Sequence, residues 1–144
     1  MSRIRYLQVT PEPFKDLGAI TKYLATASID PLLRNLVEIR ISQINGCVYC
    51  VDYHTKESRA HGETQPRLDQ LPVWQEALLF TDRERAALDW SESVTHISQT
   101  HAPDDKYEAL KAHFSEKEIV DLTMIISTIN AWNRISIAFR NVPK

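Results

Sequence analysis

The stretch PLLRNLVEIRISQINGCVYCVDYHTKESRAH, residues 31–61, predicts two consecutive helices joined by a tight turn. A proline opens the first helix, and apolar residues then recur at helical spacing: Leu32, Leu33, Leu36, Val37, Ile41 and Ile44. Asn45-Gly46 should end this helix, because both residue types readily adopt the left-handed conformation. The second helix is expected to start at Cys47, run to about His61 and stop at Gly62.

Helical patterns continue on both sides of this stretch. Before it, the spacing of Phe14, Leu17, Ile20 and Leu24 predicts a helix over residues 13–27. After it, residues 80–84 and 114–118 each begin with an aromatic residue followed by Thr or Ser, and a Glu comes three positions after that Thr or Ser. This pattern is typical of a capping box, so each segment should open a helix, the second of which ends near Phe139.

The rest of the sequence contains a predicted loop and no strand pattern, which indicates the fold class. Residues 63–72 are polar and contain two prolines, which predicts a surface loop. No segment alternates convincingly with a period of two, and only three glycines occur. We therefore expect an all-α, multihelical protein with a single domain over residues 1–144.

Composition narrows the class of function. Hydrophobic residues make up 43% and charged residues 25%, as in ordinary globular proteins, and the net charge of −2 gives no footprint for nucleic acid. The most apolar stretch, residues 119–139, includes Asp121 and Arg134, which favours a buried helix over a membrane span. The first residues, MSRIRY, contain no apolar core of a signal peptide, so we expect a cytoplasmic protein.

Cys47, Cys50 and His54 carry the candidate chemistry. On a helix they lie within roughly 60° of one another, and an i, i+3 spacing brings two Cα atoms to about 5–6 Å, within disulfide range. A purely structural disulfide would be out of place in the cytoplasm, so a redox-active pair is the better interpretation. Cys47 lies in the first helical turn, where the helix dipole stabilises a thiolate, and His54 is close enough to Cys50 to share its proton.

Glu38 is the fourth candidate. It lies between Val37 and Ile39 in the preceding helix, where a carboxylate needs a polar partner. The turn at Gly46 could fold Glu38 back towards His54. The hypothesis is a proton relay in which Glu38 holds His54, and His54 takes the proton from a cysteine.

The run Glu38…Ser42-Gln-Ile-Asn-Gly-Cys47-x-x-Cys50-x-x-x-His54 resembles the core of the alkylhydroperoxidase AhpD family, within the carboxymuconolactone decarboxylase superfamily. The likeness extends over most of the chain, including Trp74, residues 80–94 and residues 130–134. The resemblance implies an AhpD-like fold that assembles into trimers or hexamers. The apolarity of residues 119–139 on more than one side also favours a homo-oligomer.

The resemblance also implies an activity, namely thiol-dependent reduction of hydroperoxides through a cysteine disulfide. Cys50 matches the peroxidatic cysteine, Cys47 the resolving one, and His54 and Glu38 the proton relay. It further implies an external dithiol reductant, such as a lipoyl group or a thioredoxin-like partner. The family often has a histidine just before the second cysteine, and here that position is Tyr49.

Several alternatives stay open at this point. The cysteines could be two small core residues, or zinc ligands together with His54, although no second Cys/His cluster exists to complete a structural zinc site. We therefore expect no metal and no cofactor. The chain could also be a non-enzymatic redox sensor or assembly protein. A lactone decarboxylase of the same superfamily is a further alternative, but that chemistry has no need of the cysteine pair.

Overall fold

The computed structural model describes residues 2–144. Met1, the first residue of the expected domain and of the MSRIRY segment, lies outside the described residues. The α-helices are α1 (Tyr6–Val9), α2 (Glu12–Ala25), α3 (Pro31–Asn45), α4 (Val48–Ala60), α5 (Gln65–Gln70), α6 (Asp82–Thr95), α7 (Ile97–Thr100), α8 (Asp104–Lys111) and α9 (Glu116–Ala138). One 3₁₀ turn, η1, covers Leu71–Val73. Residues 2–144 contain no strand, which confirms the all-α prediction.

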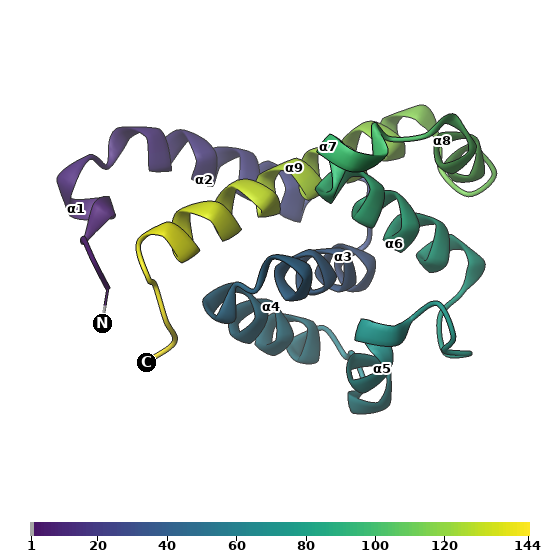
Figure 1. Ribbon diagram of the computed structural model, residues 1–144, viewed down its shortest axis with the longest axis horizontal. Coiled ribbons are helices and arrows are strands. Elements are labelled where there is room, and N and C mark those ends of the chain that lie inside the picture. The colour runs from purple at the N-terminus through teal and green to yellow at the C-terminus, as the bar shows by residue number, and fades with distance from the viewer. Residues whose placement is uncertain (1) are drawn as a thin grey trace.

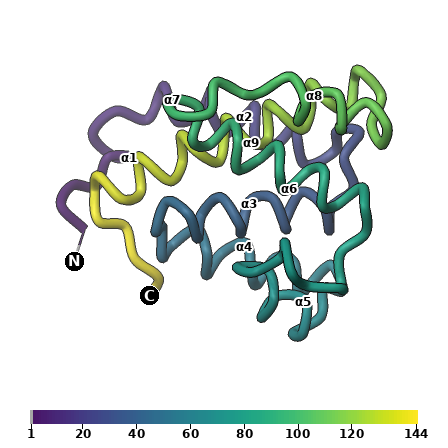
Figure 2. Tube along the Cα trace, turned by 45° about the vertical axis from the view of Figure 1, so that its right-hand side comes forward, coloured from purple at the N-terminus to yellow at the C-terminus, as the bar shows by residue number. Residues whose placement is uncertain are grey.

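Helix α3 is the centre of the molecule. It packs against α4 on one side and α9 on another, and α6 also contacts it (Figures 1 and 2). Leu33, Val37 and Ile41 of α3 are buried against apolar residues of α6 and α9 in the main core cluster. Both cysteines belong to the same cluster, so the candidate site is built on the best-packed part of the fold.

The predicted helix ends are confirmed by their caps. The Asp30 side chain accepts a hydrogen bond from the Leu33 amide at 3.0 Å, and Gly46 ends α3 with φ 73° and ψ 32°. Both capping boxes are present, at Thr81–Glu84 before α6 and at Ser115–Glu118 before α9.

The surface loop expected over residues 63–72 is a wrong prediction. The segment forms α5 and runs into η1, with Leu68 and Leu71 buried in a second apolar cluster. Both prolines of the segment lie in the first turn of a helix, where a missing backbone N–H costs nothing. Proline marked helix starts here instead of a loop.

The two ends of the chain lie on the same side of the molecule (Figures 1 and 2). The Arg3 amide donates to the Phe139 carbonyl at 2.8 Å, and the rings of Tyr6 and Phe139 stack with centroids 5.1 Å apart. This contact brings α1 beside the end of α9. Within residues 2–144, no helix has the combined length and apolarity that a membrane crossing requires.

Candidate active site

The site begins at the turn between α3 and α4. Because Gly46 takes the left-handed conformation, the chain reverses there and Cys47 becomes the N-cap of α4. The Cys47 sulfur accepts a hydrogen bond from the Cys50 amide at 3.3 Å. The sequence Asn-Gly-Cys therefore places the first cysteine at the positive end of a helix dipole.

Buried amides on α9 fix this turn. The Asn45 side-chain amide donates to Asn130 Oδ1 at 3.0 Å and to Asn133 Oδ1 at 2.9 Å. Asn133 in turn donates to the hydroxyl of Ser42 at 3.0 Å. These two polar residues of the apolar helix thus anchor the end of α3.

Cys47 and Cys50 form a disulfide, with Cα atoms 5.4 Å apart. Their spacing was expected to bring them within bridging distance, and the structure confirms it. The two residues are only 1% and 4% exposed, respectively. The disulfide is therefore largely shielded from solvent, and a cavity lies beside Cys50.

This cavity has a volume of about 330 Å³. Cys50 and His54 both line it, one helical turn apart on α4, whereas Cys47 does not. The other lining residues come from α1, α2, α4, α9 and the C-terminal segment: Tyr6, Leu7, Thr21, Tyr49, Tyr53, Trp132, Ser136 and Asn141. The cavity that Cys50 lines is thus walled mainly by aromatic side chains, with a few hydroxyl and amide groups among them.

Two carboxylates hold the imidazole of His54. Its Nδ1 atom lies 3.1 Å from Glu38 Oε2 and 3.1 Å from Glu57 Oε2. Ionised carboxylates only accept hydrogen bonds, so Nδ1 carries a hydrogen and Nε2 is the nitrogen left for the cavity. We call Glu38 and Glu57 the carboxylate pair.

Only one member of the carboxylate pair was predicted from the sequence, namely Glu38; Glu57 was missed. The signal was available, since Glu57 follows His54 by three residues on the same helix and such residues are neighbours. Sequence reasoning also missed Asn35, which is fully buried and donates to Glu38 at 3.2 Å and to Glu57 at 2.7 Å. Polar residues within an apolar helical stripe were the available signal.

The charges around His54 favour its protonated form. Burial alone would lower the pKa of this imidazole, but the hydrogen bonds and negative charges of Glu38 and Glu57 outweigh it and raise the pKa to about 9. The hydrogen bond with His54 likewise holds the pKa of Glu57 below its ordinary value. At neutral pH the site therefore contains an imidazolium.

Comparison with known proteins identifies the family. A model of the carboxymuconolactone decarboxylase family matches residues 11–93, which is more than half of the chain and includes both cysteines, His54 and the carboxylate pair. The chain belongs to the carboxymuconolactone decarboxylase family.

Two relatives with similar sequences are uncharacterized bacterial proteins. YdfG of Bacillus subtilis (strain 168) is 42% identical over 139 residues, which cover 96% of this chain and 95% of YdfG. YnjA of Escherichia coli (strain K12) is 30% identical over 110 residues, covering 76% of this chain and 60% of YnjA. Neither relative supplies an activity.

Solved structures confirm the AhpD-like fold. A protein of unknown function from Agrobacterium tumefaciens, described as a candidate AhpD antioxidant defence protein, superposes with a TM-score of 0.96 at 43% identity. The match covers 100% of this chain and 99% of that one. An AhpD-core, peroxidase-related protein from Ralstonia eutropha JMP134 shares the fold with a TM-score of 0.85, at 24% identity over 96% of this chain and 74% of its own.

Tyr49 is where this member of the carboxymuconolactone decarboxylase family departs from the AhpD pattern. Its ring stacks on that of Tyr53, with centroids 6.3 Å apart, and both residues line the cavity of Cys50. Tyr53 in turn meets the His54 ring edge-on at 5.1 Å. A phenol, that of Tyr49, therefore stands where the AhpD resemblance leads us to expect a second imidazole, and the phenol of Tyr53 lies beside it.

The site offers a metal ion few free ligands. With the sulfurs joined, Cys47 and Cys50 offer no thiolate, and zinc is bound by thiolates. Among residues 2–144, the one group of metal-ligand types with converging atoms is the carboxylate pair with His54, all within 4.8 Å. The guanidinium of Arg34 and the amide of Asn35 already face both carboxylates, so a proton fits this cluster better than a divalent cation.

Proposed function

We propose that this chain is a thiol-dependent hydroperoxide reductase that cycles through the Cys47–Cys50 disulfide. One observation carries the proposal: Cys50, in the first turn of α4, shares a small cavity with a histidine that is held by carboxylates. This combination supplies a thiol, an imidazolium beside it that can stabilise the thiolate and donate a proton, and a space for the substrate. Family membership supports a peroxidase-related enzyme.

Peroxide reduction starts from Cys50 as a thiolate, which the imidazolium of His54 stabilises while the proton of the pair stays on Nε2. The thiolate attacks the distal oxygen of the hydroperoxide, the O–O bond breaks, and Cys50 becomes a sulfenic acid. The departing alkoxide takes the proton from His54 and leaves as an alcohol. Cys47 then attacks the sulfenic sulfur, so that the disulfide forms and water leaves.

The cavity supports the assignment of Cys50 to the attack. Cys50 lines it and Cys47 does not, although Cys47 lies closer to the end of the helix dipole. The aromatic lining favours an organic hydroperoxide, since hydrogen peroxide needs no apolar contact. An external dithiol, lipoyl or thioredoxin-like, completes the cycle by exchange at the sulfur of Cys50.

We expect the disulfide to be reversible within one chain. Reduction should give two free thiols, and one equivalent of organic hydroperoxide should remove both, because the helix already holds the sulfurs together. Alkylation followed by intact mass spectrometry reads the thiol count. The redox cycle would be refuted if both thiols stayed free, or if stoichiometric zinc co-purified and protected them.

Turnover separates the enzyme from a redox sensor. With excess dithiol such as dihydrolipoamide, an enzyme consumes many equivalents of cumene hydroperoxide per chain. A sensor or assembly switch oxidises once and consumes no more than its own thiols. Consumption limited to one equivalent per chain would therefore contradict the proposal.

We also propose that the chain forms a homo-oligomer, a trimer or hexamer as the AhpD resemblance implies. On α9, Val120 is 61% and Met124 39% exposed, so the helix keeps apolar side chains on its outer face as well as in the core. Light scattering at micromolar concentration should give a multiple of 16.6 kDa. A mass of one chain would contradict this.

A further inference from the structure

We infer that Glu57 is a positioning residue of this site, whose charge keeps His54 protonated so that its Nε2 can donate to the leaving group. This inference deepens the proposed function and rests on it for the reaction, but it makes its own claim about the charge of His54. Sequence comparison with the AhpD motif points only to Glu38 as the partner of His54. The structure adds the second carboxylate.

Glu57 is held in place from another helix. Its Oε2 accepts from the Asn35 side-chain amide at 2.7 Å, and its Oε1 lies 3.7 Å from Arg34 Nη2. Asn35 is itself fixed, since its Oδ1 lies 2.8 Å from His61 Nδ1. A surface glutamate seldom has such partners, so this carboxylate occupies a prepared position between α3 and α4.

The charge balance gives Glu57 its distinct effect. With Glu38 alone, the guanidinium of Arg34 would neutralise the cluster, and burial would favour a neutral imidazole at His54. The second carboxylate leaves one negative charge over, which the imidazolium of His54 balances. Both carboxylates thus hold the same ring nitrogen, and Glu57 brings the negative charge that Arg34 leaves unbalanced.

Groups from each neighbouring element are consistent with this balance. Helix α3 brings Arg34 and Glu38, α4 brings Tyr53 and Glu57, and α1 contributes Tyr6 to the cavity wall. The residues that α9 adds to the wall, Trp132 and Ser136, do not titrate. Arg34 is therefore the cation, besides His54, that faces the pair.

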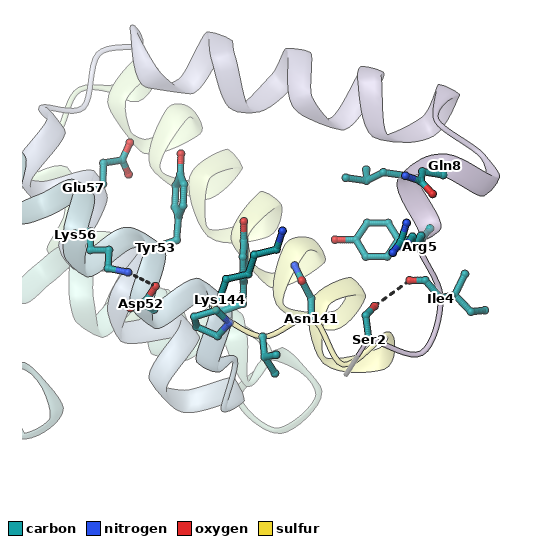
Figure 3. Close-up of a pocket in the computed structure, with 15 residues that line it drawn as sticks. Ser2, Ile4, Arg5, Gln8, Asp52, Tyr53, Lys56, Glu57, Asn141 and Lys144 are labelled. Carbon is teal, nitrogen blue, oxygen red and sulfur yellow. Dashed lines mark hydrogen bonds and ion pairs between the residues drawn. The ribbon is translucent and has the colours of Figure 1, made fainter.

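Glu57 also borders a wider groove of about 1010 Å³ beside the cavity (Figure 3). Figure 3 shows Glu57 and Tyr53 on one side of this groove, with Arg5 and Gln8 across from them. The Glu57 side chain keeps 31% of its exposure, against 11% for Glu38. The hydrogen bond with His54 holds the pKa of Glu57 below its ordinary value and outweighs its partial burial, which raises that pKa.

The test compares three variants in the reduced, full-length protein. Glu57→Gln removes the charge and keeps the size and a hydrogen-bonding group, and Glu57→Asp restores the charge. Asp52→Asn is the matched control, because Asp52 lies on the same helix and along the same groove but pairs with Lys56 at 2.8 Å. NMR titration of the His54 ring measures its pKa directly, and kcat/KM for cumene hydroperoxide is followed against pH.

In Glu57→Gln, the pKa of His54 should fall by about 1–3 units, as expected when an opposite charge in contact is removed. The alkaline limb of the pH profile should move down with it. Glu57→Asp should recover part of the shift, and Asp52→Asn should leave the His54 pKa unchanged.

An unchanged His54 pKa in Glu57→Gln would overturn the inference, even if the melting temperature fell, because that pattern marks a merely structural contact. A shifted pKa in a protein without peroxide turnover would uphold the inference and refute the proposed function. A shift of equal size in Asp52→Asn would also overturn it, since any nearby negative charge would then suffice.

Discussion

Replacing Cys50 with serine should reduce peroxide turnover to the background rate. A serine hydroxyl stays protonated at neutral pH and forms no sulfenic acid, so neither the attack nor the disulfide can occur. The measurement is consumption of cumene hydroperoxide with excess dithiol, at equal protein concentration. Cys50 is 4% exposed within the core cluster, so the melting temperature of the variant must be compared alongside.

Cys47→Ser is the matched control for this variant. It removes the sulfur of the other cysteine but leaves the attacking thiol, so without added dithiol it should reduce about one equivalent of peroxide per chain and then stop as a sulfenic acid. A dimedone label with mass spectrometry detects that acid. If Cys47→Ser were inert and Cys50→Ser gave the burst, the two cysteines would have exchanged functions.

Much of the fold could be predicted from local signals. The start of α3 at Pro31, its end at Gly46 and both capping boxes were read correctly, because caps are encoded within a few residues. Residues 63–72 were wrongly predicted as a loop, because a proline disrupts a helix interior but is tolerated in the first helical turn, where both prolines lie. Burial of Leu68 and Leu71 depends on distant partners in α3 and α6, which no local pattern reports.

The candidate site was predicted to the extent that it lies along one helix. The helical period placed Cys47, Cys50 and His54 together, and the turn suggested that Glu38 could reach His54, as the 3.1 Å contact now shows. The residues that line the cavity could not be predicted from local signals. Tyr6 and Trp132 are far from α4 in the sequence and reach the cavity through tertiary packing of α1 and α9. Nor could spacing alone indicate that His54 has two carboxylate partners.

Replacing His54 with alanine, or Glu38 with glutamine, should slow peroxide reduction by about 10²–10⁴-fold, the contribution of a positioned proton-transfer group. Without His54, the Cys50 thiolate loses the cation that stabilises it, and the alkoxide loses its proton donor. Without the charge of Glu38, the ring loses one of its two anchors. Because the two residues act as one unit, the double variant should be little slower than His54→Ala alone.

The pH profile completes this prediction. His54 has a pKa of about 9, above its ordinary 6.5, so its proton is retained at low pH and lost as the pH rises through 9. Turnover in the native protein should therefore fall as the pH rises through 9, and the stability that the imidazolium contributes should be lost as the pH rises from about 6.5 to about 9. His54→Ala should lack this alkaline limb, whereas His113→Ala, at an exposed histidine outside the site, should keep both rate and limb. A Glu38→Gln protein with normal turnover and an unchanged limb would remove Glu38 from the relay and leave His54 dependent on Glu57 alone.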